Sequence, residues 1–233
     1  YIIHHQRPRS FQEALVNMVH RRNGDREVFW ALQDVSFSID PGETVGIIGP
    51  NGSGKSTALK LISRIIEPTN GSVAVAGRVA ALIELGAGFH PDLTGRENIY
   101  LLGSIMGISG REMDRRFSAI VEFAELERFI DTAVKHYSSG MYMRLGFATA
   151  IHVDADLFLI DELLAVGDEH FQRKCLEAIQ RFQQQGMTVV LVTHDLPLVG
   201  KFCPRTILLQ QGRLVADGPT PGVVQQYLEV AAH

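Results

Sequence analysis

The sequence predicts an α/β protein in which a core with parallel strands carries an antiparallel β subdomain and a helical subdomain. Three observations predict this class. A short apolar strand at Thr44–Ile48 runs into a glycine-rich loop and then a helix. Two later apolar runs, Leu157–Ile160 and Thr188–Val192, are continuous, which is typical of parallel strands covered on both faces. Residues 93–150, which lie between the loop and these runs, follow a mostly helical pattern.

The N-terminal part is expected to begin with a helix over residues 10–22, where apolar side chains recur with the spacing of one helix face. Ser10 and Glu13 form a capping-box pattern at its start. The other elements expected before the helical middle are strands at 28–39, 71–75 and 78–83, the last two near a sheet edge, and a helix at 55–65.

Within the helical middle, Ser109 and Glu112 form a second capping-box pattern, followed by apolar residues on one helix face. Near the C-terminus, residues 207–209 and 213–216 are expected to pair as a hairpin around Gln211-Gly212. The predicted division is a first part of the core with the glycine-rich loop and the β subdomain at 1–91, a helical subdomain at 92–150 and a second part of the core at 151–233.

Composition limits the possible functions. The chain has 233 residues, a formal net charge of −4, 45% hydrophobic and 21% charged residues, which is ordinary for a soluble globular protein. The acidic balance does not favour nucleic acid, so no such partner is expected. No apolar run approaches the ~18 residues that span a bilayer, and no signal peptide is visible. Cys175 and Cys203 lack metal-ligand spacing and are interpreted as buried thiols in a reducing compartment. The chain begins at Tyr1 rather than Met, so further natural residues are expected before it.

Residues 49–56 match the phosphate-binding pattern G-x-x-x-x-G-K-[ST] of P-loop NTPases. Glycines let backbone N–H groups approach a phosphate, and the following helix N-terminus favours anions. Lys55 is expected to reach the β- and γ-phosphates of ATP, and the Ser56 hydroxyl to bind Mg²⁺. The alternative, a chance glycine-rich turn, does not explain the strand before it and the helix after it. The predicted nucleotide-binding residues of this loop are Gly49, Asn51, Gly52, Ser53, Gly54, Lys55, Ser56 and Thr57.

The apolar run at 157–160 ends in two carboxylates, Asp161 and Glu162. Ligands of α/β sheets bind at the carboxyl ends of the strands. We expect Asp161 to hold Mg²⁺ through water, and Glu162 to polarise the attacking water as a general base. An apolar run ending in Asp-Glu is on its own usually a strand that meets a loop, but its position downstream of a P-loop favours the catalytic interpretation.

Tyr137-Ser138-Ser139-Gly140-Met141 lies between the P-loop and the acidic pair. Here the chain resembles the ABC ATPase family, whose signature is Leu-Ser-Gly-Gly-Gln followed by a helix. Ser138 and Gly140 fit the signature, whereas the other three residues depart from it.

Two later stretches extend the resemblance. Residues 165–168 are similar to the D-loop of the family, with Asp168 at its end, and His194 is similar to the switch histidine. A lone histidine after a strand is usually structural, but the order of motifs favours a catalytic role. The resemblance implies a homodimer with ATP sandwiched between subunits, where the P-loop of one faces Ser138, Ser139 and Gly140 of the other. It also implies ATP and Mg²⁺ as cofactors, membrane-spanning permease subunits as partners, and a peripheral location on the cytoplasmic face of the cell membrane.

Two positions leave alternatives open. Members of the family carry an aromatic residue near the N-terminus that stacks on adenine, and Tyr1 fits this role better than Trp30, which precedes an expected strand. The Gln loop of the family should fall near residues 83–90, which contain no Gln. Glu84 or a backbone group is a candidate replacement. This loop and the helix at 10–22 are hypothesised to face the membrane and contact the permease.

Local stretches are similar to one branch of the family, the exporters of lipid-linked polysaccharides such as O-antigen, capsule or teichoic acid. They are residues 84–98, the altered signature at 137–141, residues 160–168 and the long insertion after Tyr1. In some members a carbohydrate-binding domain follows the ATPase, and this chain is expected to be such an ATPase without its tail. The alternatives are an exporter of another substrate, a soluble ABC ATPase acting on ribosomes or DNA, and a P-loop small-molecule kinase. Neither a second cassette nor a coiled-coil insert, which ribosome- or DNA-acting members commonly carry, is visible.

Overall fold

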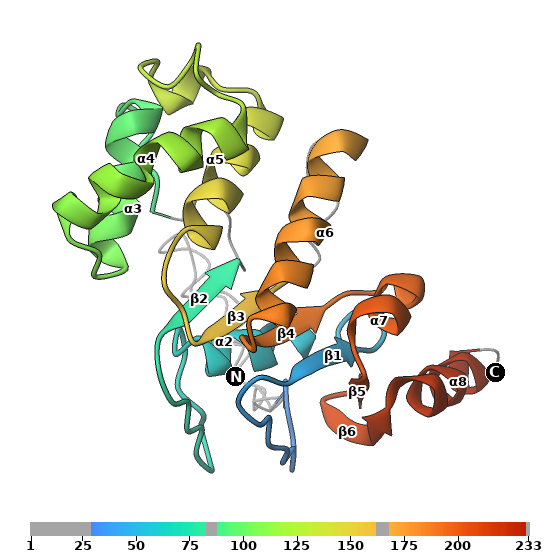
Figure 1. Ribbon diagram of the computed structural model, residues 1–233. Coiled ribbons are helices and arrows are strands. Elements are labelled where there is room, and N and C mark those ends of the chain that lie inside the picture. Colours follow the sequence, from blue (N-terminus) through green and yellow to red (C-terminus); the bar gives the residue numbers. More distant parts are fainter. Residues whose placement is uncertain (1–28, 83–87, 162–167, 232–233) are drawn as a thin grey trace, which may run out of the picture.

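The protein is an α/β structure built on one six-stranded sheet, seen here in a computed structural model that describes residues 29–82, 88–161 and 168–231 (Figure 1). The strand order is β2-β3-β4-β1-β5-β6, and all neighbours are parallel except the β5–β6 pair. The strands are β1 (Thr44–Ile48), β2 (Val79–Leu82), β3 (Leu157–Ile160), β4 (Thr188–Val192), β5 (Arg205–Gln210) and β6 (Arg213–Pro219).

The continuous apolar runs form the middle of this sheet, as predicted, because helices cover both of its faces. On β4, Val190 and Val192 pack with α2 (Lys55–Ile62) in one buried cluster. Val189 and Leu191 point the other way, into a second cluster with the helices of the opposite face. Those helices are α6 (Glu169–Gln184), α7 (Leu196–Phe202) and α8 (Thr220–Ala231).

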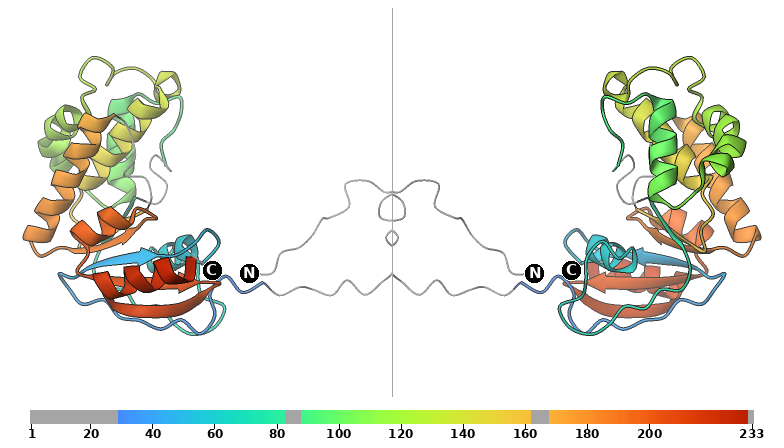
Figure 2. Two further views of the ribbon diagram at one scale, coloured as in Figure 1. Left: turned by 90° about the vertical axis from the view of Figure 1, so that its right-hand side faces the viewer. Right: turned by 90° about the vertical axis from the view of Figure 1, so that its left-hand side faces the viewer.

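The helical middle forms a third buried cluster beside the sheet. Its elements are α3 (Gly95–Ile105), α4 (Gly110–Ala124), the 3-10 turn η1 (Val134–His136) and α5 (Ser139–Ile151). Helix α5 joins the two regions, because Leu145 packs in the helical cluster while Phe147 and Ile151 pack against the sheet. The side views place α3–α5 at one end of the molecule and the β5–β6 hairpin with α8 at the other (Figure 2).

Two segments that were expected to be strands are not strands. Residues 29–39 and 71–75 have no assigned strand in the described part of the chain, and helix α2 ends at Ile62 rather than at residue 65. The alternation that suggested a strand is nevertheless real, since Val35, Phe37 and Ile39 are half-buried against the core while the residues between them are exposed. The alternation of apolar and polar residues therefore predicted correctly which side chains are buried, but it did not predict whether the backbone pairs with a neighbouring strand. Antiparallel pairing among the described residues occurs in the predicted hairpin, which turns at Gln211 and Gly212.

The second capping box is also absent. Ser109 is the N-cap of α4 but makes no side-chain cap hydrogen bond. The Glu112 carboxylate instead lies 2.6 Å from the guanidinium of Arg116. A complete capping box occurs at α3, where Thr94 and Glu97 bond each other reciprocally.

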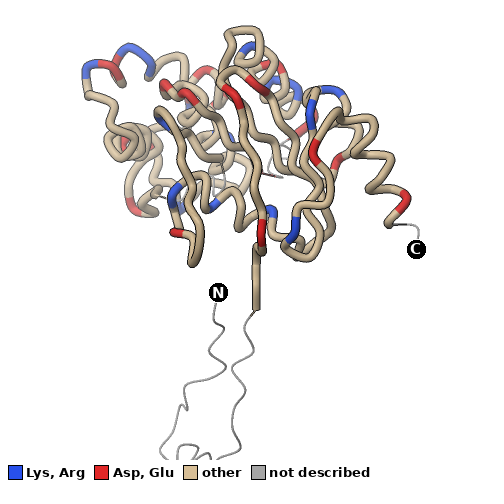
Figure 3. Tube along the Cα trace, turned by 90° about the horizontal axis from the view of Figure 1, so that it is seen from below, with Lys and Arg blue, Asp and Glu red and all other residues tan. Residues whose placement is uncertain are grey.

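Several expectations lie outside the described residues: the helix at 10–22, Tyr1, the loop at 83–87, Glu162 and residues 165–167. The expected strand at 78–83 is confirmed as β2, an edge strand of the sheet. Both cysteines are free and buried, and burial raises the pKa of each thiol to about 12. Of the helices in the described ranges, none is long and apolar enough to cross a membrane. Charged residues of both signs are scattered along the described trace (Figure 3).

Candidate nucleotide-binding site

Three predicted motifs meet at one edge of the sheet. Strands β3, β4 and β1 are parallel neighbours, with Ile160 beside Leu191 and Ile47 beside Val192. Their carboxyl ends therefore lie at the same edge. The glycine-rich loop follows β1, Asp161 follows β3, and His194 follows β4 two residues after its end.

The loop needs glycine for space and for backbone conformation. Gly54, the N-cap of α2, has a φ of 104°, and a Cβ there would lie 2.6 Å from Leu32 Cδ2 and 2.7 Å from Ala31 O. A Cβ at Gly49, where φ is 150°, would lie only 2.0 Å from Leu209 O. A side chain at either position would displace the loop from the backbone beside it, which is residues 31–32 at Gly54 and β5 at Gly49.

The loop borders a cavity of about 470 Å³. Its volume is in the range of small-molecule sites. The predicted P-loop residues and Asp161, which follows β3, line this cavity. Gly49 is the one predicted P-loop residue that does not line it. The lining residues are Phe29, Ala31, Asn51, Gly52, Ser53, Gly54, Lys55, Ser56, Thr57 and Asp161.

Lys55 is buried, and its ammonium is held by the loop itself. The Nζ atom donates to Gly49 O at 2.8 Å and to Pro50 O at 3.1 Å. An ammonium has three donors, so these two bonds are compatible with a further one to a phosphate. Beside it, the buried Ser53 Oγ has no hydrogen-bond partner among the described residues. A buried unpaired hydroxyl is costly, and a phosphate oxygen is a suitable acceptor for it.

The residues expected to hold Mg²⁺ lie on the same cavity. Ser56 is in the first turn of α2, and Asp161 directly follows β3. A hydroxyl and a carboxylate are hard oxygen ligands of the kind that Mg²⁺ prefers, so the donor set fits. His194 is exposed just beyond β4 and is not one of the lining residues.

Sequence reasoning missed one aromatic residue of the cavity. Phe29 lines it with 53% of its surface exposed, whereas Trp30, which the sequence offered as the competitor of Tyr1, does not line it. Phe29 and Trp30 are adjacent and both fall in the expected strand at 28–39. The spacing of apolar residues in the sequence does not indicate which of the two faces the cavity.

The altered signature begins a helix, as the resemblance implied. Ser138 is the N-cap of α5, and its Oγ accepts a hydrogen bond from Met141 N at 3.2 Å. Ser139 is the first residue of the helix. Ser138 and Gly140 border a second cavity of about 450 Å³. Its lining residues are Glu125, Leu126, Phe129, Ser138, Gly140, Met141, Arg144 and Asp168, none of which lines the first cavity.

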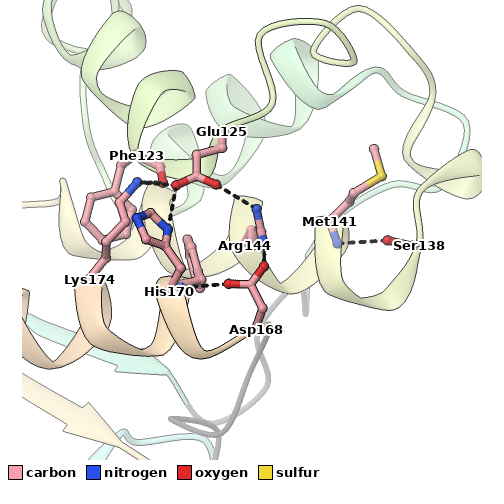
Figure 4. A network of polar contacts seen from close by, with 9 residues as sticks. Phe123, Glu125, Ser138, Met141, Arg144, Asp168, His170 and Lys174 are labelled. Atoms are coloured by element: carbon pink, nitrogen blue, oxygen red, sulfur yellow. Dashed lines mark hydrogen bonds and ion pairs between the residues drawn. The ribbon is translucent and has the colours of Figure 1, made fainter.

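A polar network fixes this second cavity (Figure 4). Arg144 on α5 lies 2.9 Å from the Glu125 carboxylate and also pairs with Asp168. The other carboxylate oxygen of Asp168 accepts from Phe171 N at 2.9 Å, so that Asp168 caps α6. This backbone hydrogen bond is the main cause that lowers the pKa of Asp168. Helix α5 and the start of α6 are thus joined through Arg144.

Glu125 is the centre of the network. Lys174 Nζ donates to its carboxylate at 2.9 Å, and His170 Nδ1 lies 3.4 Å away. The hydrogen bond from Lys174 is the largest cause that lowers the pKa of Glu125, followed by the charges of Lys174, Arg144 and His170. The same lysine bonds Phe123 O at 2.9 Å. Sequence reasoning did not find Glu125 or Arg144, because their pairing depends on helix packing rather than on a local pattern.

The parallel sheet and the loop-to-helix cavity at its carboxyl edge define a P-loop nucleotide-binding protein. The family model described as "ABC transporter" matches residues 32–165. This chain belongs to the ABC transporter family.

Relatives with assigned names cover most of this chain. The O-antigen export system ATP-binding protein RfbB of Myxococcus xanthus is 49% identical over 209 residues, which are 90% of this chain and 48% of that protein. The RfbB protein of Klebsiella pneumoniae is 45% identical over 88% of this chain and 83% of its own length. The teichoic acids export ATP-binding protein TagH of Lactiplantibacillus plantarum is 43% identical over 94% of this chain and 60% of its own length. The chain therefore spans about half the length of the Myxococcus relative.

Solved structures share the fold. An ATP-binding subunit of an ABC transporter has a TM-score of 0.76 and 29% sequence identity, with 84% of this chain and 87% of that chain covered. A dimeric ATP-binding cassette in a post-hydrolysis state with ADP and Pi has a TM-score of 0.73 and 28% identity, with 83% and 92% covered. The predicted fold class is confirmed.

Proposed function

We propose that this chain is the ATP-binding and ATP-hydrolysing subunit of an ABC transporter that exports a lipid-linked polysaccharide across the cytoplasmic membrane. The observation that carries the proposal is the presence of both halves of a composite ATP site on one chain. The first cavity holds the P-loop and Asp161, and the second holds Ser138, Gly140 and Asp168. Relatives named for O-antigen and teichoic acid export support the polysaccharide branch.

The P-loop residues supply binding and charge neutralisation. Backbone N–H groups at the start of α2 and the Lys55 ammonium receive the phosphates. Ser56 and Asp161 hold Mg²⁺, which neutralises charge on the β- and γ-phosphates when bound. Glu162 is assigned as the base that accepts a proton from the attacking water, and His194 as a residue near the γ-phosphate. Phe29 is an aromatic candidate for stacking on adenine beside the predicted Tyr1, because it lines the cavity.

The second cavity is assigned to the partner subunit's nucleotide. The helix start at Ser138 favours an anion, and the Ser138 hydroxyl and Gly140 N–H are the groups proposed to reach the γ-phosphate. The two cavities share no lining residue, so a second copy of the chain is the natural source of the missing half. Permease subunits, a peripheral position at the cytoplasmic face, and the division at 1–91, 92–150 and 151–233 belong to this proposal.

Replacing Glu162 by glutamine tests hydrolysis. The base is lost while the phosphate cradle remains, so we expect ATP affinity to stay similar and kcat to fall by about 10²- to 10⁴-fold, the usual contribution of a general base. Phosphate release and calorimetry measure the two quantities. Glu169→Gln is the matched control, because this carboxylate begins α6, seven positions later in the sequence, with 90% of its side chain exposed.

Substantial turnover by Glu162→Gln, with Glu169→Gln unchanged, would remove Glu162 as the base. The export assignment has its own test, in which the full-length subunit is reconstituted with its permease. ATP turnover should rise with a lipid-linked polysaccharide and not with the lipid carrier alone. An equal response to both would count against polysaccharide export.

A further inference from the structure

The first residue of the signature segment is Tyr137, where the family pattern has leucine. Its side chain reaches the start of α3 near Gly95, and its hydroxyl donates to Phe129 O at 2.7 Å. Burial raises the pKa of Tyr137 to about 12. The phenol therefore keeps its proton at neutral pH and remains a hydrogen-bond donor, which a leucine could not be.

Gly95 faces this hydroxyl. A Cβ at Gly95 would lie 2.3 Å from the Tyr137 Oη, a distance that real Cβ atoms do not show, and 3.1 Å from Ile130 O. Gly95 is buried at the first position of α3, and its φ is not in the left-handed region. The space for a Cβ is taken first by the tyrosine hydroxyl and then by Ile130, whose Cδ1 and O would each lie 3.1 Å away, whereas the backbone conformation of Gly95 does not itself require glycine.

The chain around this pair is tightly bonded. The start of α3 meets the segment between α4 and η1 through two backbone hydrogen bonds, Gly95 N to Thr132 O at 3.2 Å and Arg96 N to Ile130 O at 2.9 Å. Tyr137 N in turn bonds Val134 O at 3.0 Å. The hydrogen bond from the Tyr137 hydroxyl to Phe129 O therefore links the two ends of the segment 129–137.

Both ends of this segment reach the second cavity. Phe129, whose carbonyl accepts the hydrogen bond, lines it with 47% of its surface exposed. Ser138, which follows the tyrosine, lines it as the N-cap of α5. The Tyr137–Phe129 hydrogen bond thus fixes the distance between two parts of the cavity wall.

We propose that Tyr137 and Gly95 are a coupled pair that positions Ser138 and Phe129 for the nucleotide of the opposite subunit. Tyr137 is a positioning residue, and Gly95 is the small residue that admits its hydroxyl. The tyrosine at the first signature position, where the family pattern has leucine, then fixes the start of the signature helix by its hydrogen bond. The small residue Gly95, 42 positions earlier in the sequence, leaves room for its hydroxyl. This inference rests on the proposed function, since it assigns the cavity to ATP hydrolysis.

Four variants test the pair: Tyr137→Phe, Tyr137→Leu, Gly95→Ala, and the double variant Gly95→Ala/Tyr137→Leu. Tyr137→Phe removes only the hydroxyl. We expect ATP affinity of the P-loop to change less than about 2-fold and kcat to fall about 5- to 10-fold, the loss of one net hydrogen bond. Tyr100→Phe is the matched control, because its hydroxyl bonds Asp114 at 2.6 Å on the outside of the helical subdomain, away from both cavities.

The double variant measures the coupling. Gly95→Ala should lower kcat strongly in the presence of Tyr137 and much less in the presence of leucine, because contacting residues are non-additive. Thermal unfolding of each variant provides a second readout of the same cycle. If Gly95→Ala does not fold, recovery of folding in the double variant supports the coupling equally well.

The proposal is overturned if Tyr137→Phe keeps full turnover, or if Gly95→Ala costs the same with Tyr137 and with leucine. The second result would mean that Gly95 is required by the Ile130 backbone alone. A wild-type protein that binds ATP but does not hydrolyse it would refute the proposed function itself, and with it the role of the pair, whatever the unfolding cycle shows.

Discussion

At the scale of single residues, backbone carbonyls of the P-loop accept hydrogen bonds from the ammonium of its own lysine, Lys55. The Lys55 ammonium is buried and bonds Gly49 O and Pro50 O, so the charge is partly solvated by the loop that it serves. Lys55→Ala should weaken ATP binding about 10- to 100-fold, as expected for the loss of a hydrogen bond to a charged group. Calorimetric titration with ATP measures this. Lys60→Ala, on the same helix but outside the cavity, is the control, and equal affinities of the two variants would contradict the role.

Single residues also show where sequence reasoning stops. The P-loop residues and Asp161 were found because their spacing is local and each strand delivers its end to the same edge. Arg144, Gly95 and Phe29 were not found, since each depends on a contact with residues distant in the sequence. Arg144 meets Glu125 across 19 positions, and Gly95 meets Tyr137 only after two helices have packed. The structure places the P-loop residues and Asp161 on one cavity, and their binding roles remain predictions, as do the catalytic roles of Glu162 and His194.

At the scale of elements, two helices with similar start patterns begin differently. At α3, Thr94 Oγ1 accepts from Glu97 N at 3.2 Å, and Thr94 N donates to Glu97 Oε2 at 2.8 Å. At α4, Glu112 pairs with Arg116, which also holds Asp154 at 2.6 Å, so the carboxylate does not return to the helix start. The capping-box pattern considers only the N-cap residue and the residue three positions later, so it could not predict that Arg116 would bind the Glu112 carboxylate.

The difference between the two caps is measurable. Thr94→Ala should lower the free energy of unfolding by about 1 kcal/mol, a typical cost of losing an N-cap side chain. Ser109→Ala should lower the free energy of unfolding by only a few tenths of a kcal/mol, because Ser109 makes no side-chain cap hydrogen bond. Denaturant unfolding compares both variants with the wild type. Equal losses for the two substitutions would show that the hydrogen-bonded capping box does not account for the stability of α3.

Element prediction succeeded where apolar periodicity and chain continuity agreed. Strands β1, β3 and β4 and the β5–β6 hairpin were predicted within a few residues. The segment at 29–39 was not, because burial of alternate side chains does not specify a pairing partner. The strand order was also beyond reach, since β1 lies between β4 and β5, whose segments come more than 140 positions later in the chain.

At the scale of the whole molecule, the two cavities are held in a fixed relation by α5 and the Arg144 network. Helix α5 packs both in the helical cluster and against the sheet, and Arg144 joins it to the capped start of α6. The signature helix therefore contacts the helical cluster, the sheet and the start of α6 at once. Under the proposed function, this connection would hold the second cavity and the start of α6 together when ATP binds.

The last prediction concerns assembly. With ATP and Mg²⁺, Glu162→Gln should form a two-fold dimer of doubled mass in light scattering, because ATP persists and joins the P-loop of one subunit to the signature of the other. Without nucleotide the protein should be mostly monomeric. Adding Gly140→Asp should abolish the dimer and leave ATP binding intact. A Cβ at Gly140 would meet only Ser138 Oγ, at 3.9 Å, so the monomer has room for it, whereas a carboxylate there would repel the γ-phosphate of the opposite subunit. A strict monomer of Glu162→Gln at high concentration, or a dimer unaffected by Gly140→Asp, would exclude the sandwich.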